Sequence, residues 1–171
     1  MENLLEYRKQ KDWFFENDQH SPLAAEQKES FQGLDYFPED TQLRFETEIE
    51  PFKEQVHVEM QTSTGDLQEY TKYGRFQFDV DGESAELTIY TSADGGAFVP
   101  FVDGTSGKET YGAGRYLELE HLAGNKYRVD FNLAYNPWCA YSPFFSCPIP
   151  PQENRLSVPI RAGEKNFSSS H

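Results

Sequence analysis

The segment Asp130–Pro151 gathers most of the residues whose side chains could do chemistry. It reads DFNLAYNPWCAYSPFFSCPIPP and contains both cysteines, one of the two tryptophans and several prolines. Proline disfavours the helical conformation in the residue before it, so helix is disfavoured at Asn136, Ser142 and Cys147. The sequence therefore predicts a long, irregular, proline-rich loop over residues 132–151. Long irregular loops in compact domains are commonly functional.

Cys139 and Cys147 are the candidates for thiol chemistry. They stand farther apart than zinc-binding cysteine pairs usually do, no histidine nearby completes a ligand set, and a CxxC redox motif is absent. A nucleophilic Cys139 would need a base, and only folding could bring His57 or His121 to it. The alternative is that both cysteines are small apolar residues packed among aromatic rings. We expect free thiols, no metal site and no cofactor.

Two carboxylates are a second candidate for catalysis. The alternation in RYLELEHL and KYRVDFN predicts a hairpin with a three-residue loop at Ala123–Asn125, which sets Glu120 opposite Arg128. The same register sets Glu118 opposite Asp130 on the polar face. Adjacent carboxylates repel one another unless a cation or a shared proton relieves them, and such a pair suits acid–base catalysis.

The glycine-rich segment 103–115, DGTSGKETYGAGR, is expected to meet the proline-rich loop at one end of the sheet. It has neither the phosphate-binding P-loop spacing nor a dinucleotide-binding fingerprint. Arg115 is the strong anion donor expected there. Pockets combine apolar walls with a few polar groups, and the candidate ligand-binding residues are Tyr111, Arg115, Asn132, Tyr135, Asn136 and Trp138. The alternatives are a tight glycine turn and a loop whose aromatic rings complete the core.

The elements that must position these residues are mainly β-strands. An N-terminal helix is expected over residues 1–20, with Leu4, Tyr7, Lys11 and Phe14 at helical spacing, followed by a β core over 41–161 and a frayed tail at 168–171. Further strands are expected at 68–73, 97–103 and 156–161. Many short strands with turn signals predict a single domain of residues 1–167, an antiparallel β-sandwich or barrel with one helix.

The clearest hairpin has its turn at Asp81–Gly82, between RFQFDV and ESAELTIY. An Asp-Gly turn between alternating strands is a strong hairpin signal. It would set Phe78 opposite Ala85 and Phe76 opposite Leu87, so that both strands bury apolar residues on the same face.

The amino-acid composition limits the classes of partner that the protein could bind. The chain has 171 residues, 37% of them hydrophobic, and a net charge of −14. This charge argues against nucleic acid and anionic membranes as partners, because phosphates would be repelled. No apolar run is long enough to cross a bilayer, and the start MENLLEYRKQKDWFF lacks the pattern of a signal peptide. We therefore expect a cytoplasmic protein. The sequence does not indicate its oligomeric state.

Three ordered blocks resemble a known family. GTSGKETYGAGRYLEL, DFNLAYNPWCAY and CPIPPQENRLSVPIRAGEK look like the signature blocks of the domain of unknown function 1684, and YRKQKDWFF, SPL and FQGLDYF resemble its start. The resemblance covers nearly the whole chain. It implies a bacterial or archaeal single-domain protein, and it assigns no activity and no catalytic residues.

Three functions stay open at this point. The first is binding of a small molecule, with an anion as one option, between segments 103–115 and 132–151. The second is an enzyme of hydrolase or lyase type that uses Glu118 and Asp130, or Cys139. The third is an interaction or scaffold protein whose exposed aromatic residues meet a partner.

Overall fold

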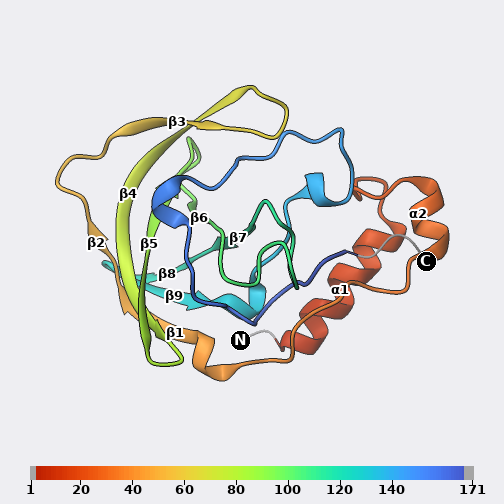
Figure 1. The fold of residues 1–171 in the computed structure, drawn as a ribbon, viewed down its shortest axis with the longest axis horizontal. Helices are drawn as coiled ribbons and strands as arrows, with labels where there is room; N and C mark the ends of the chain where they lie inside the picture. Colours follow the sequence, from red (N-terminus) through yellow and green to blue (C-terminus); the bar gives the residue numbers. More distant parts are fainter. Residues whose placement is uncertain (1–2, 168–171) are drawn as a thin grey trace.

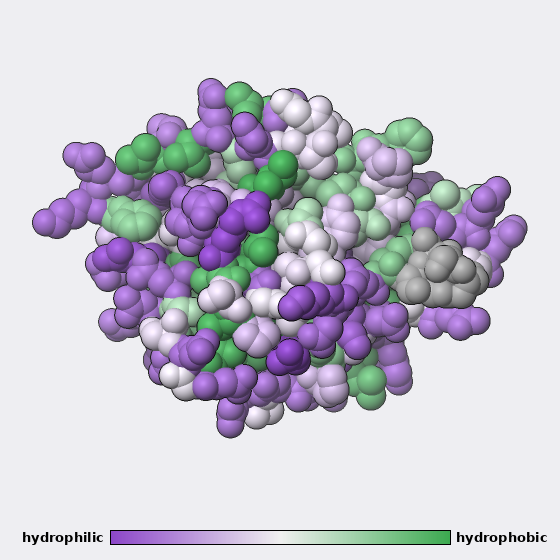
Figure 2. Space-filling view, viewed as in Figure 1, coloured by the Kyte–Doolittle hydropathy of each residue, from purple (hydrophilic) through white to green (hydrophobic). Residues whose placement is uncertain are grey.

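The computed structural model describes residues 3–167, so the predicted tail at 168–171 and the first two residues of the predicted helix lie outside the described residues. The helices lie at one end of the molecule and the β-sheets at the other (Figure 1). The proline-rich loop runs between these two ends. On the face seen in Figure 2, hydrophilic side chains dominate both ends, and hydrophobic side chains are exposed in a band across the middle.

The N-terminal helix α1 (Leu4–Asn17) confirms the predicted helix. The side chain of Asn3 accepts a hydrogen bond from the Leu5 amide at 2.8 Å, which satisfies one of the free N–H groups at the helix start. A second, short helix, α2 (Ala25–Ser30), was not predicted. Neither these two helices nor any other in the described part of the chain is long and apolar enough to span a membrane.

Two antiparallel sheets carry the strands, as predicted for a mainly β fold. The larger sheet has the order β2-β4-β5-β6-β7, with β3 paired to β4, and the smaller one has the order β1-β9-β8. The strands are β1 (Arg44–Glu48), β2 (Glu50–Pro51), β3 (His57–Gln61), β4 (Leu67–Val80), β5 (Glu83–Thr91), β6 (Ala97–Phe101), β7 (Arg115–Glu118), β8 (Glu120–Ala123) and β9 (Lys126–Asp130). The sheets do not close into a barrel.

The hairpin of β4 and β5 has the predicted register. Phe78 lies opposite Ala85 and Phe76 opposite Leu87. The turn residues have positive φ values, 50° at Asp81 and 84° at Gly82. A tight hairpin turn needs this conformation, and it explains why an Asp-Gly pair occupies the turn.

The hairpin of β8 and β9 keeps the predicted pairing of Glu120 with Arg128 but reaches it in another way. Lys126 pairs with Ala123, and the register shifts between His121 and Ala123. A β-bulge therefore takes up one residue, and a two-residue turn replaces the predicted three-residue loop.

Leu119 separates the two sheets, and this corrects the predicted pairing of Glu118 with Asp130. β7 pairs with β6 in the larger sheet, whereas β8 pairs with β9 in the smaller one. Glu118 and Glu120 therefore belong to different sheets, and β9 ends before it reaches β7. The neighbour of β7 on that side is Tyr135, which forms an isolated bridge with Tyr116.

The main core lies between the two sheets and contains apolar residues from both. Its aromatic residues include Phe76, Phe78, Phe101 and Phe131, none of which is more than 7% exposed. The predicted strand at 156–161 is absent from the structure. Of its alternating apolar residues, Val158 and Ile160 are buried and Leu156 is half-buried. This segment lies beside the loop after β6, where the Gly104 amide donates to the Val158 carbonyl at 2.8 Å.

The proline-rich loop is irregular, as predicted, apart from 3₁₀ turns at Phe131–Leu133, where it begins, and at Trp138–Ala140. It packs against α1 in a second, smaller apolar cluster. The rings of Phe15 and Tyr141 meet edge to face there, with centroids 4.9 Å apart. The loop therefore connects the helical end of the molecule to the sheets.

Candidate functional site

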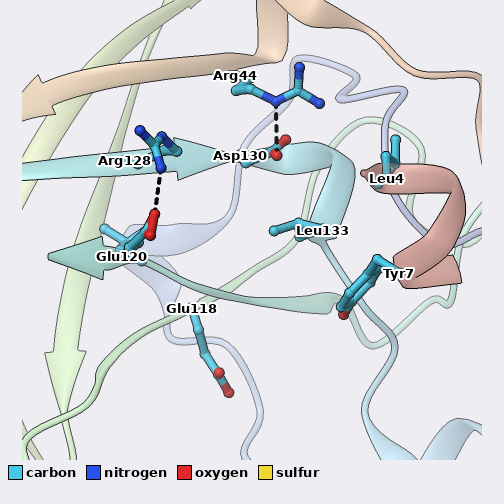
Figure 3. Close-up of a pocket in the computed structure, with 9 residues that line it drawn as sticks. Leu4, Tyr7, Arg44, Glu118, Glu120, Arg128, Asp130 and Leu133 are labelled. Atoms are coloured by element: carbon cyan, nitrogen blue, oxygen red, sulfur yellow. Dashed lines mark hydrogen bonds and ion pairs between the residues drawn. The ribbon is translucent and has the colours of Figure 1, made fainter. Parts of the chain in front are cut away.

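A cavity of about 400 Å³ lies between the first turns of α1 and the small sheet. Its walls combine apolar and charged side chains (Figure 3). They are Leu4, Tyr7, Arg44, Glu118, Leu119, Glu120, Arg128, Asp130 and Leu133.

A second, more open cavity of about 410 Å³ follows α1 toward the proline-rich loop. Its lining residues are Tyr7, Gln10, Lys11, Phe14, Phe15, Glu118, Tyr135 and Trp138. Tyr7 and Glu118 belong to both cavities. The two cavities therefore adjoin one another, and we call them together the α1 groove.

Both guanidinium groups in the α1 groove are held by carboxylates. Arg44 Nε donates to Asp130 at 3.0 Å, and Arg128 Nη1 donates to Glu120 at 2.6 Å (Figure 3). Glu39 and Asp130 hydrogen-bond to Arg44 and raise its pKa. These arginines are therefore already neutralised within the fold.

Glu118 differs from the other carboxylates of the groove. Its side chain points away from both ion pairs in Figure 3. Its carboxylate accepts a hydrogen bond from the hydroxyl of Tyr135 at 2.8 Å, and no lysine, arginine or histidine of residues 3–167 forms an ion pair with it. Burial, and then the charge of Glu118, raise the pKa of Tyr135, so the phenol stays neutral and donates.

An ammonium group already lies over an aromatic ring in this groove. Lys11 Nζ is 5.0 Å from the centre of the Tyr135 ring, a distance at which a cation is attracted to a ring face. The same ammonium forms an ion pair with the buried carboxylate of Glu164. The charge of Lys11 is therefore also compensated inside the fold.

Comparisons with known proteins assign the chain to one family. The sequence profile described as "Protein of unknown function (DUF1684)" matches residues 29–165. The chain belongs to this family. An uncharacterised protein of Haloarcula marismortui, solved by solution NMR, is 39% identical, with a TM-score of 0.72 over 95% of this chain and 91% of that one. No functionally curated protein matches the chain.

Arg115 of this DUF1684 protein lies outside the groove. Its side chain is fully buried, and its guanidinium donates to the backbone carbonyls of Ala162, Glu164 and Ile160. Asp103 compensates its charge from 3.5 Å. This placement favours a structural role for Arg115, because its hydrogen bonds go to the protein itself.

The segments 103–115 and 132–151 do meet, through Tyr111 and Cys139. The Tyr111 hydroxyl lies 3.7 Å from the Cys139 sulfur. The α1 groove lies beside the helix and includes neither of these two residues. Within residues 3–167, no group of three or more His, Cys, Asp or Glu side chains could hold a metal ion.

The two asparagines singled out in the sequence brace the backbone. The amide of Asn132 donates to the Asp40 carbonyl at 2.9 Å, and that of Asn136 donates to the Lys165 carbonyl at 3.0 Å. Both side chains are buried and outside the groove. Of the predicted ligand-binding residues, Tyr135 and Trp138 line the groove, and so do both candidate carboxylates, Glu118 and Asp130.

Glu118 and Asp130 share the cavity without forming a carboxylate pair. Asp130 accepts hydrogen bonds from Arg44 and from the backbone amide of Asn132 at 3.0 Å. Glu118 instead contacts Tyr135. The two groups therefore lack the shared proton or shared cation that a catalytic carboxylate pair uses.

The sequence did not predict that α1 contributes to the groove. Leu4, Tyr7, Lys11 and Phe14 were recognised as one helical stripe, and all four line the groove. A polar lysine and a tyrosine within an apolar stripe were the available signal. The stripe alone could not show that the helix leaves an opening beside the sheet.

Proposed function

We propose that this protein binds a small molecule in the α1 groove, and that the ligand carries a cationic group next to an aromatic or apolar part. The observation that carries this proposal is the position of Glu118. Its carboxylate belongs to both cavities, lies beside aromatic rings and has a neutral phenol as its hydrogen-bond donor. An ammonium group placed there would gain an ion pair and contact with ring faces.

The charge balance supports a cationic rather than an anionic ligand. The expected anion donor, Arg115, is buried elsewhere, and Arg44 and Arg128 are paired with carboxylates. The protein as a whole carries a net charge of −14, which attracts cations and repels anions. The contact of Lys11 Nζ with the face of the Tyr135 ring supports an aromatic wall that attracts ammonium groups.

The other two functions have weaker support. An acid–base enzyme would need Asp130 free to act, whereas Arg44 and the backbone hold it. For a scaffold protein the candidate contacts are the exposed aromatic residues Phe144, in the loop, and Trp13, on α1, which are 91% and 62% exposed. A cytoplasmic location stays a prediction, which cell fractionation would test.

The binding test uses three probes with similar skeletons: 2-phenylethylamine, 2-phenylethanol and 3-phenylpropionate. A Trp13→Phe background leaves Trp138, in the groove wall, as the single tryptophan and fluorescence reporter. We expect the amine to bind most tightly and the carboxylate most weakly. Glu118→Gln should weaken amine binding about three- to tenfold, or about 0.6–1.4 kcal/mol, as for a partly exposed ion pair.

The matched control is Glu59→Gln, which makes the same change at an exposed position of β3. It should leave the affinity for the amine unchanged. The proposal is wrong if the carboxylate binds as tightly as the amine, or if NMR shifts caused by the amine map outside the groove.

A further inference from the structure

The two cysteines meet at the base of the loop that joins them. Cys139 lies in the 3₁₀ turn, and its backbone amide donates to the sulfur of Cys147 at 3.2 Å. Both are free thiols. Their side chains therefore share one site although the chain between them loops out to Phe144, and the two thiols are close enough to hydrogen-bond.

Ser63 holds Cys147 in place from the turn between β3 and β4. The Cys147 amide donates to the Ser63 hydroxyl at 3.1 Å, and the Ser63 amide donates to the Cys147 carbonyl at 2.9 Å. Both backbone groups of Cys147 are thus fixed by one residue. These two hydrogen bonds fix the position of the buried Cys147 sulfur next to Cys139.

The surroundings favour a thiolate at Cys139. Hydrogen bonding from Cys147 lowers the pKa of Cys139 most, those from Tyr111 and Ser63 add to this, and burial opposes it. Burial raises the pKa of Tyr111, so its hydroxyl stays protonated and able to donate. The hydrogen bond to Cys139 raises the pKa of Cys147, so the first proton leaves from Cys139.

Exposure divides the two sulfurs into an outer and an inner one. Cys139 is half-buried, whereas Cys147 is only 7% exposed. A small oxidant therefore reaches Cys139 first, and Cys147 lies behind it. This is the arrangement of a reactive cysteine next to a resolving cysteine.

We propose that Cys139 and Cys147 form a peroxide-reactive thiol pair. The Cys139 thiolate attacks one oxygen of a hydroperoxide, the O–O bond breaks, and the second oxygen leaves and takes up a proton, as water when the oxidant is hydrogen peroxide. Cys139 is then a sulfenic acid. The Cys147 sulfur attacks this sulfur, the S–O bond breaks, and the departing oxygen takes up the proton of the Cys147 thiol and leaves as water. The product is a Cys139–Cys147 disulfide, formed by the loss of two electrons to the peroxide.

The experiment treats the full-length protein with hydrogen peroxide and follows it by intact-mass spectrometry and peptide mapping. The wild-type protein should lose two hydrogen atoms by forming the Cys139–Cys147 disulfide, roughly tenfold faster than glutathione reacts at pH 7, because more of the sulfur is thiolate. Cys147→Ser should stop at a sulfenic acid that dimedone traps on residue 139. Cys139→Ser should react no faster than glutathione.

Two further measurements keep the test decisive if a cysteine variant folds poorly. On the wild-type protein, limiting iodoacetamide should label Cys139 before Cys147. Tyr111→Phe, which removes a hydrogen-bond donor to Cys139, should slow the peroxide reaction severalfold. Equal labelling of both cysteines, disulfides between separate chains, or a wild-type rate no higher than that of glutathione would overturn the proposal. Glu59→Gln, at an exposed position of β3 outside the α1 groove, should not change the rate.

Discussion

The guanidinium of Arg115 and the carboxylate of Asp103 lie 3.5 Å apart, and both side chains are completely shielded from solvent. Asp103 also accepts a hydrogen bond from the Ile160 amide at 2.6 Å, while Arg115 donates to the Ile160 carbonyl at 2.9 Å. The pair thereby fastens the C-terminal segment to the loop after β6 and to the start of β7. This segment forms no β-strand, so the buried ion pair and its hydrogen bonds hold it in place where strand pairing holds other segments.

Breaking this ion pair should destabilise the fold. Arg115→Met leaves the Asp103 carboxylate buried without its cation, and we expect the free energy of unfolding to fall by about 3–5 kcal/mol. Adding Asp103→Asn to this variant should recover part of the loss, because it removes the uncompensated charge. Urea unfolding of the two variants and the wild type measures both effects. A loss below about 1 kcal/mol for Arg115→Met would contradict the structural role.

Asn154 links two strands of the larger sheet through its side chain. It accepts from the Thr88 amide at 2.8 Å and donates to the carbonyls of Thr88 and Pro100, each at 2.9 Å. Asn154→Ala should leave these buried groups unpaired, at roughly 1–3 kcal/mol each where water cannot replace the amide. Thermal and urea unfolding should therefore show a loss of at least about 2 kcal/mol. Asn166→Ala, the same change at an exposed asparagine, is the control and should cost less than about 1 kcal/mol.

Lys11 and Glu164 should be energetically coupled. Glu164 is 1% exposed, and its carboxylate also accepts hydrogen bonds from the Tyr141 hydroxyl at 2.6 Å and from the backbone amide of Asn136 at 3.2 Å. Lys11→Met should cost about 2–3 kcal/mol, because a carboxylate stays buried without a cation. In the double variant with Glu164→Gln the two losses should not add, and the difference should exceed about 0.5 kcal/mol. Lys9→Met, at an exposed position of α1, is the matched control.

Asp66 should make the attachment of the proline-rich loop sensitive to acid. Its carboxylate accepts hydrogen bonds from Thr62, Thr64 and Ser146, which hold its pKa well below the ordinary value of an aspartate. A depressed pKa in the folded state contributes stability above the unfolded-state pKa of about 4 and loses it as the pH falls further. The difference in unfolding free energy between wild type and Asp66→Asn should thus be constant above about pH 5 and shrink below about pH 4. An unchanged difference at pH 3 would contradict this assignment.

Local signals predicted the hairpin of β4 and β5 correctly. The Asp81–Gly82 turn and the alternation around Phe76 and Leu87 are encoded within a short stretch, so they need no knowledge of the rest of the fold. The break at Leu119 is different. Residues on both sides of it alternate as in one continuous strand, and only the arrival of β6 on one side and β9 on the other assigns them to two sheets.

The candidate site was predictable to the extent that side-chain type marked it. Tyr135, Trp138 and the carboxylates Glu118 and Asp130 were found because aromatic and acidic residues stand out in loops and on polar strand faces. Arg115 was assigned to a ligand because the predicted register placed it where the two loops meet, and a guanidinium is a strong anion donor. Its real partners, Asp103 and three carbonyls near the C-terminus, lie far from it in the sequence or carry no side-chain signal.

The contact between α1 and the C-terminal segment bears on how the chain folds during synthesis. Lys11 and Glu164 are separated by 153 positions. The helix therefore leaves the ribosome long before Glu164 has been synthesised. Phe15 likewise emerges long before Tyr141, whose ring it contacts in the folded protein. Such non-local contacts close late, because the chain between them must be ordered first. A nascent chain that stops before residue 164 would therefore lack the carboxylate that pairs with Lys11 inside the fold.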